Sequence, residues 1–171
     1  MFQLSFGYSA EMSGWLLAPI ALMSVIFKTL VGRILNCLGY KTTLLISSML
    51  MAGSVVSMAW IDQQTSLIWI VVNLMWYGAC MSMIFTAVNT LTVGDLSTEQ
   101  AGTGSTVLSI VQQLGIGFGI AVSSIILNLY RYHFGNEGEG LQQAFNYTFL
   151  TSTIFAIILV LTVLKLHKTD G

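Results

Sequence analysis

The sequence predicts an all-α, polytopic transmembrane helix bundle with five spans. Two observations concern composition: 55% of the 171 residues are hydrophobic and only 8% are charged. A soluble domain usually carries about a quarter charged residues. The third observation is the arrangement, because long uncharged stretches alternate with short polar segments. Each stretch is close to or above the roughly 20 apolar residues that a membrane-spanning helix needs.

The first two spans are expected at 14–36 and 42–60. Residues 1–13 are interpreted as an external stub and loop. Pro19, the only proline, lies in the first turns of the first span and favours a kink or a loosened turn there. Gly39 allows a tight turn between the two spans. Trp60 marks a membrane surface, where tryptophan is enriched at headgroup level.

The last three spans are expected at 67–92, 103–130 and 144–165, joined by polar loops at 94–101 and 133–143. No charged residue lies between Asp62 and Asp95. The aromatic and basic run Tyr130–Tyr132 marks the surface at the end of the fourth span. Residues 14–168 are therefore expected to form one five-span domain, followed by a cytoplasmic tail at 169–171.

The fourth span combines an apolar surface with a face of small and polar residues. This face recurs at spacings of three and four and includes Ser105, Ser109, Gln112, Gly115 and Gly119. Gly115 and Gly119 form a GxxxG pair, which lets two helices approach closely in lipid. We therefore predict that Gly115, Gly119, Ser105 and Ser109 pack against a neighbouring helix.

Four amides inside the spans are candidates for a substrate pathway: Gln112, Gln113, Asn89 and Asn73. An unpaired amide is costly in hydrocarbon, so each must face water or protein. One interpretation places them on a cavity, where they bond a substrate. The alternative is that they bond a neighbouring helix, and for the two asparagines we favour this alternative.

Lys28 is the one charge well inside a span, because Arg33 lies three residues before the end of the first span and Lys165 is the last residue of the fifth. It could be a cavity cation that binds or repels an anion. The alternative, which we favour from the sequence, is a lysine that snorkels to the cytoplasmic surface. No aspartate or glutamate lies inside any of the five spans, so a proton-carrying carboxylate would have to lie elsewhere.

The basic residues divide unequally between the two sides of the membrane. Arg33, Lys41, Lys165 and Lys168 fall on one side, whereas the other carries Arg131 among Glu11, Asp62, Glu137 and Glu139. Lysine and arginine favour the cytoplasm, so we expect an external N-terminus and a cytoplasmic C-terminus in the cell (inner) membrane. A chain that starts outside without a signal peptide, and with an odd number of spans, is expected to be incomplete.

Several functional classes are disfavoured. The net charge of −1 disfavours a nucleic-acid partner. The two cysteines, Cys37 and Cys80, have no neighbours at metal-ligand spacing, so neither a metal site nor a disulfide framework is expected. The sequence contains no nucleophile–base set and no phosphate-binding glycine loop, so we expect neither an enzyme nor a bound cofactor.

Two segments resemble the major facilitator superfamily. The run from Gly32 to Leu44 resembles the family's short loop motif: Gly32, Ile34, Gly39 and Lys41 fit, whereas Asn36, Cys37 and Tyr40 depart from it. The run from Phe85 to Ala121 resembles a late helix–loop–helix of the 14-span drug:proton antiporters, with Asn89, Gly102, Gly104, Gln113, Gly115 and Gly119 in the same relative order.

The resemblance implies an alternating-access carrier that exchanges a proton for a small amphipathic compound, of which this chain would be the last five spans. The expected partners are the lipid bilayer, a small organic substrate with a proton, and the missing N-terminal half. Two alternatives stay open: a non-transporting membrane scaffold, and a half-carrier that pairs with another membrane protein.

Overall fold

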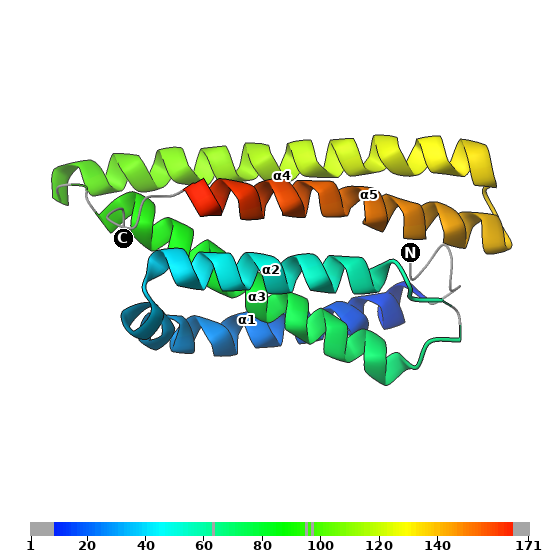
Figure 1. Cartoon of the computed structure of the whole chain (residues 1–171), viewed down its shortest axis with the longest axis horizontal. Helices are drawn as coiled ribbons and strands as arrows, with labels where there is room; N and C mark the ends of the chain where they lie inside the picture. Colours follow the sequence, from blue (N-terminus) through cyan, green and yellow to red (C-terminus); the bar gives the residue numbers. More distant parts are fainter. Residues whose placement is uncertain (1–8, 63, 95, 97, 166–171) are drawn as a thin grey trace.

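The computed structural model describes residues 9–62, 64–94, 96 and 98–165, and it places five helices in this part of the chain. They are α1 (Ala10–Leu38), α2 (Tyr40–Met58), α3 (Leu67–Gly94), α4 (Thr98–Phe134) and α5 (Gly138–Lys165). All five are long and apolar enough to cross a membrane. Successive helices run in alternating directions along the long axis of the molecule, which is horizontal in Figure 1, and α3 is oblique to the others. The predicted all-α bundle of five spans is therefore confirmed.

The helices begin earlier or end later than hydropathy predicts. Residues 10–13, expected in an external loop, form the first turn of α1, where the Ser9 hydroxyl accepts a hydrogen bond from the Met12 backbone N–H at 3.1 Å. This is N-cap geometry, which fixes a helix start whatever the polarity of its first residues. Helix α1 continues through Pro19 without a break. The other parts of the expected external stub and of the tail, residues 1–8 and 166–171, lie outside the described residues.

The predicted loops at 94–101 and 133–143 are also too long. Helix α4 begins at Thr98, and only residues 135–137 separate α4 from α5. Gly135 and Gly138 make this short turn at φ 110° and 56°, conformations that suit glycine. Gly39, at φ 76°, is the one residue between α1 and α2, so the predicted tight turn is confirmed. These helices continue into polar segments because backbone hydrogen bonds of a helix form in water as well as in lipid.

Helices α1 and α3 meet at an unusually close crossing. A methyl group built on Gly78 would lie 2.5 Å from the Ile20 carbonyl oxygen, so only glycine fits there. The Ser82 hydroxyl donates to the Ser24 carbonyl at 2.9 Å, and the Ser24 hydroxyl lies 3.1 Å from the Gly78 carbonyl. Small residues that admit backbone approach and bond across helices are the usual basis of packing in lipid.

Away from this crossing, the helices pack through two apolar clusters and the hydrogen bond of one amide. One cluster joins α1, α2, α3 and α5 through Val31, Leu35, Leu44, Ala87 and Val163. The other lies towards the opposite end and contains Leu16, Ile61, Ile70 and Leu74. The buried Gln142 of α5 donates to the Ile61 carbonyl at 2.6 Å, which fixes α5 to the end of α2.

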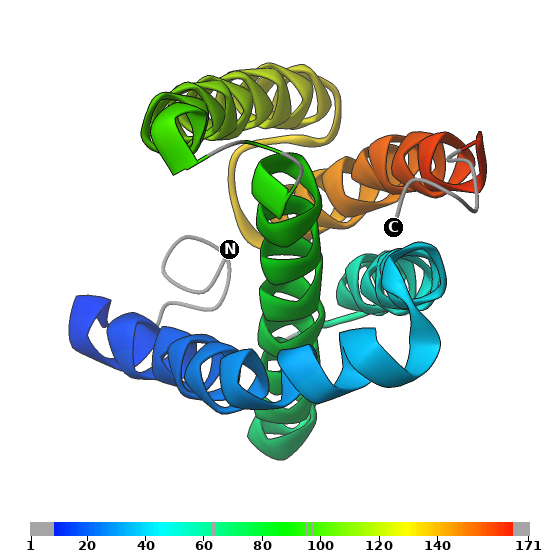
Figure 2. The ribbon, with the colours of Figure 1, turned by 90° about the vertical axis from the view of Figure 1, so that its left-hand side faces the viewer.

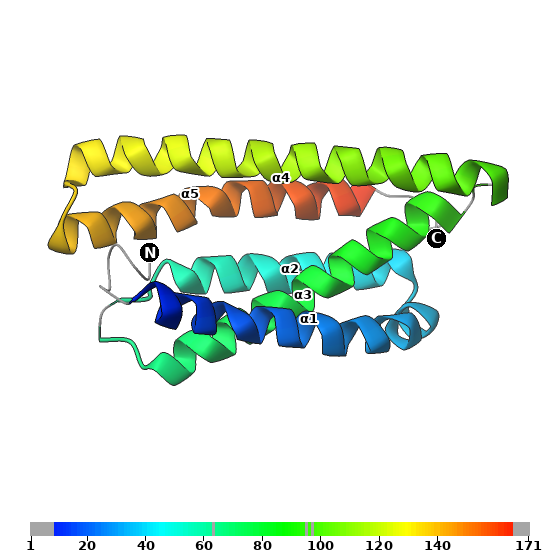
Figure 3. The ribbon, with the colours of Figure 1, turned by 180° about the vertical axis from the view of Figure 1, so that it is seen from behind.

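Helix α4 lies at the edge of the bundle, as the view along the long axis shows (Figure 2). In the described part of the chain it contacts α5 and, over a shorter length, α3. The view from behind shows α3 rising obliquely away from α1 towards the start of α4 (Figure 3). Most side chains of α4 are exposed, and many of them are large and apolar.

Candidate functional site

A pocket of about 470 Å³ lies between α1 and α3 and contains the intramembrane lysine. Ser24, Val25 and Lys28 contribute to it from α1. Its other lining residues come from α3: Met81, Ser82, Phe85, Thr86, Asn89 and Thr90. The pocket thus combines one cation, several hydroxyl groups, one amide and apolar walls.

Helical spacing places these side chains together. Ser24 and Lys28 are four residues apart on α1, and Ser82, Thr86 and Asn89 follow at intervals of four and three on α3. Residues at such spacings share a helix face. The crossing at Gly78 brings the two faces together, because Ser24 and Ser82 belong both to this crossing and to the pocket wall.

Helix α4 reaches this pocket through a pair of amides. The Gln112 Nε2 donates to Asn89 Oδ1 at 3.4 Å, a long hydrogen bond, while Asn89 Nδ2 donates to the Phe85 carbonyl at 2.6 Å. Asn89 therefore connects the α1–α3 pocket to α4, since it lines the pocket together with Lys28 and bonds Gln112. Two of the four predicted pathway amides, Asn89 and Gln112, thus come together in the structure.

Lys28 lies deep along α1. It is ten residues before the helix end at Leu38, which is about 15 Å along the axis at 1.5 Å per residue. For a centred helix this is roughly 9 Å inside the hydrocarbon boundary, a distance that the lysine stem covers only in part. The structure places the exposed Lys28 side chain on the pocket wall, and the cavity and snorkelling alternatives both stay predictions.

Asn73 is on a different side of α3 and bonds α2. Its Oδ1 accepts from the Ser54 hydroxyl at 2.7 Å, and its Nδ2 donates to the Ser57 hydroxyl. The side chain is buried. These bonds correspond to the interhelical alternative, so Asn73 serves the α2–α3 contact in this structure and is separate from the pocket that contains Asn89.

The small-residue face of α4 has no close neighbour within the described helices. Methyl groups built on Gly115 and Gly119 would meet no atom within 4 Å, and both glycines are exposed. Ser105 and Ser109 donate to carbonyls of their own helix, at 2.6 and 2.8 Å. Gln113 is exposed on the same helix. A packing role for this face stays a prediction, and its partner would come from outside the described residues.

The predicted loop motif is almost entirely helical. Gly32 is exposed on α1 and Lys41 is the second residue of α2, so Gly39 alone forms the connection. The motif therefore runs from Gly32, about 6 Å along α1 from Lys28, to the Gly39 turn where α1 meets α2 at the end of the bundle.

Sequence reasoning missed the crossing at Gly78 and the bond made by Gln142. A signal for the first was present, because Gly78 and Ser82 are small residues at four-residue spacing, as Gly115 and Gly119 are. The sequence predicts a loop at Gln142, and nothing in the local sequence indicates that its amide reaches the carbonyl of Ile61.

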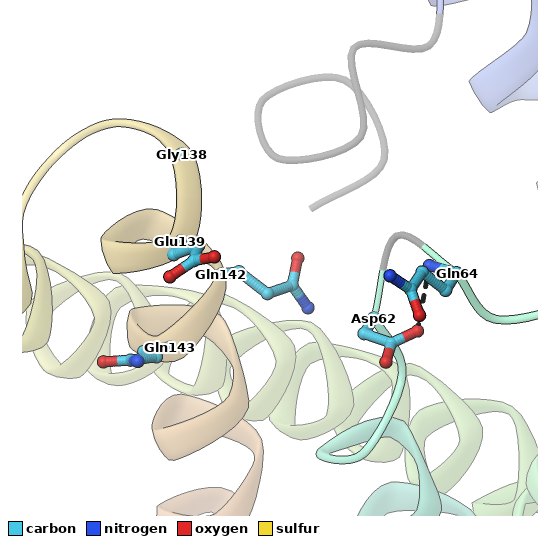
Figure 4. A pocket seen from close by; sticks show the side chains of 6 residues that line it. All are labelled: Asp62, Gln64, Gly138, Glu139, Gln142 and Gln143. Carbon is cyan, nitrogen blue, oxygen red and sulfur yellow. Dashed lines mark hydrogen bonds between the residues drawn. The ribbon is translucent and has the colours of Figure 1, made fainter.

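A second pocket, of about 430 Å³, lies at the end of the bundle that holds the α2–α3 and α4–α5 connections (Figure 1), and Figure 4 shows the side chains that line it. Asp62 and Gln64 border it from the α2–α3 connection, and Glu139, Gln142 and Gln143 border it from the start of α5. A hydrogen bond from the Thr65 hydroxyl at 2.7 Å, with others from backbone N–H groups, lowers the pKa of Asp62 below its usual value. This end therefore carries negative charge.

The fold and the pocket define a class: a polytopic helical membrane protein with polar side chains gathered between its spans. Residues 1–120, more than two thirds of the chain, match the family model of the Major Facilitator Superfamily. The chain therefore belongs to the Major Facilitator Superfamily, a family of membrane transporters.

Curated relatives agree with this assignment. The chain is 74% identical over 171 residues to the "Probable transport protein HsrA" of Haemophilus influenzae, covering 100% of this chain and 37% of that protein. It is 30% identical over 164 residues to the "Putative multidrug resistance protein MdtD" of Enterobacter sp., covering 89% of this chain and 32% of that protein. The corresponding protein of Serratia proteamaculans is 28% identical over 172 residues, covering 99% and 35%. The chain thus spans about a third of these relatives' length, and no solved structure matches it.

Proposed function

We propose that this chain forms part of one half of a secondary transporter that exports small amphipathic organic compounds in exchange for protons. The observation that carries the proposal is the pocket shared by Lys28, Asn89 and, through its amide bond, Gln112, because it brings polar groups of three helices together inside the spans. Polar and ionisable groups at such depth are costly and usually mark a substrate or ion pathway.

The membrane setting follows from the charges. Lys41 and Lys165 lie at helix ends on one side, and Arg33 lies five residues before the end of α1 on the same side. We place this side in the cytoplasm of the cell (inner) membrane. The acidic pocket with Asp62 and Glu139 would then face outwards. The N-terminus is external and the C-terminus cytoplasmic in this arrangement.

The exposed face of α4 favours a carrier with more helices. Secondary transporters move substrates by rocking two halves around a site near the membrane midplane, and the face with Gly115 and Gly119 is open for helices of the other half. The same observation allows a half-carrier or a scaffold that pairs with another membrane protein, and transport assays separate these possibilities.

The test is a chimera in which this chain replaces the matching segment of the Haemophilus influenzae relative, to which it is 74% identical. We expect dye efflux from energised cells that an uncoupler abolishes, because the proton gradient drives export. The 171-residue chain expressed alone should reach the membrane without causing efflux. Uncoupler-sensitive efflux from the chain alone would favour the half-carrier, and an inactive but membrane-inserted chimera would favour the scaffold.

A further inference from the structure

We propose that the α1–α3 pocket binds the anionic head of an amphipathic organic acid, with the Lys28 ammonium as its counter-ion. The inference rests on the proposed function, because it names the substrate class of that pathway. The structure gives three independent grounds for it: the charge balance of the pocket, the use of its other donors and the chemistry of its walls.

The charge of Lys28 has no counterpart nearby. Within the part of the chain that the structure describes, Lys28 has no ion-pair or hydrogen-bond partner. The seven carboxylate side chains of the sequence are Glu11, Asp62, Asp95, Glu99, Glu137, Glu139 and Asp170, and none belongs to the interior of a span. A charge at this depth is costly unless it is paired or hydrated, so an anion that enters the pocket gains a strong electrostatic partner.

Most other donors of the pocket are used within the helices. The hydroxyl of Ser82 donates to the Ser24 carbonyl, that of Thr90 donates to the Thr86 carbonyl, and Asn89 Nδ2 donates to the Phe85 carbonyl. The ammonium group is therefore the principal donor available to a ligand. A carboxylate, phosphate or sulfonate head fits this arrangement, whereas a cationic head would meet a like charge.

The walls of the pocket suit an apolar body attached to the anionic head. Val25, Met81 and Phe85 line the same pocket, and its volume of about 470 Å³ is in the range of sites that hold small organic molecules. Methionine and aromatic side chains adapt to varied apolar shapes. An anion with an apolar body should therefore bind more tightly than the same head group alone.

The experiment uses the purified 171-residue chain in phosphatidylcholine nanodiscs, with empty nanodiscs as the blank. Binding is measured by titration calorimetry for 2-naphthoate, for the neutral 2-naphthamide, for 2-naphthyltrimethylammonium and for acetate, which lacks the apolar body. We expect 2-naphthoate to bind about tenfold more tightly than the amide, because a charge-assisted hydrogen bond is roughly twice as strong as a neutral one. The cation and acetate should bind more weakly still.

The variants separate the pocket from general charge. Lys28→Met should abolish the preference for 2-naphthoate over the amide, and Lys28→Arg should keep it. Arg33→Gln removes a cation from the same helix outside the pocket and should change nothing. Equal binding of the three naphthyl compounds, no binding of 2-naphthoate to a chain that melts cooperatively, or an unchanged preference in Lys28→Met would overturn the proposal. Acetate binding as tightly as 2-naphthoate would overturn the amphipathic substrate class.

Failure here is distinguishable from failure of the proposed function. A chimera that exports neutral or cationic compounds but not 2-naphthoate would support the transport function and contradict the proposal of an anionic substrate. Selective binding of 2-naphthoate by the chain, with no export by the chimera, would support the anion site and contradict the transport function.

Discussion

At the scale of residues, Asn73 and Asn89 show how position on a helix separates two identical side chains. They are sixteen residues apart on α3, which at 3.6 residues per turn rotates one about 160° from the other. Asn73 consequently faces Ser54 and Ser57 of α2, while Asn89 lines the pocket on the other flank. The sequence alone could have predicted that the two differ, but not which of them would face α2.

The bonds of Asn73 should stabilise the bundle more than those of Asn89. In a double-mutant cycle of Asn73→Ala and Ser54→Ala, we expect a coupling of about 0.6–2 kcal/mol in the free energy of unfolding, the range found for hydrogen bonds between helices in membranes. Asn89→Ala combined with Ser54→Ala is the control pair and should show no coupling, because Asn89 bonds Phe85 and Gln112 and makes no bond to α2. Unfolding by sodium dodecyl sulfate, followed by circular dichroism, measures both. Zero coupling would show that the Asn73 bonds do not hold α2 to α3.

The carboxylate of Asp62 should titrate below its usual range. The Thr65 hydroxyl is the largest cause of the lowered pKa, because it donates to the ionised form. A lowered pKa in the folded chain means that the contribution to stability is present above the unfolded value and is lost as the pH falls through the folded one. Thr65→Val should therefore raise the pKa of Asp62, as carboxyl ¹³C chemical shifts can follow, whereas Thr162→Val on α5 should leave it unchanged. An unchanged pKa in Thr65→Val would contradict the assignment.

At the scale of elements, hydropathy predicts the spans well but their ends poorly. All five expected spans are helices, yet α4 runs from Thr98 to Phe134, several residues beyond the expected 103–130 at its start and end. The apolar pattern reports which residues can lie in lipid, and a helix continues past it until a cap or a glycine such as Gly135 stops it. The packing partner of a helix is harder to predict, because a pair of small residues indicates close approach without identifying the neighbouring helix. Gly78 has a close neighbour among the described helices, and Gly115 does not.

The α1–α3 crossing should be the most sensitive helix contact to an added methyl group. Gly78→Ala places a carbon 2.5 Å from the Ile20 carbonyl oxygen, and the backbone must move to admit it. We expect a loss of about 1–3 kcal/mol, the usual cost of overpacking. Gly53→Ala on α2 is the control, because its methyl group meets no atom within 4 Å. Thermal melting in detergent measures both, and equal melting temperatures would mean that the close approach does not exist.

At the scale of the whole molecule, the two ends of the bundle differ in charge and the edge helix α4 is largely uncovered. The sequence predicted the first property from the sidedness of its loops. It also predicted a packing face on α4, but the structure shows that this face has no partner among the described helices. The chain spans about a third of its relatives' length, so the helix that packs on this face can belong to a segment outside these residues. No local pattern in these residues can specify that helix.

The orientation of the molecule can be tested on native cysteines. Cys37 is exposed in the last turns of α1, beside the Gly39 turn, and Cys80 is buried on α3. With the Gly39 turn in the cytoplasm, a membrane-impermeant maleimide should label Cys37 only after the cells are permeabilised. Cys37→Ser should remove this labelling, because buried Cys80 reacts little. Labelling of Cys37 in intact cells would reverse the orientation and place the acidic pocket in the cytoplasm.

The uncovered face of α4 gives a prediction that depends on which molecule is measured. In the 171-residue chain, Gly115→Leu and Gly119→Leu should leave the melting temperature within about 2 °C of the parent or raise it, because an added side chain finds open space and leucine favours a helix more than glycine does. In the chimera with the Haemophilus influenzae relative, the same changes should reduce efflux strongly, because a bulky side chain keeps another helix from approaching this face. Ile116→Leu alters the same helix without filling the glycine face and should preserve efflux in the chimera. If both glycine variants export as well as the parent, the other half of the carrier does not pack on Gly115 and Gly119, and the uncovered face of α4 is a surface for lipid.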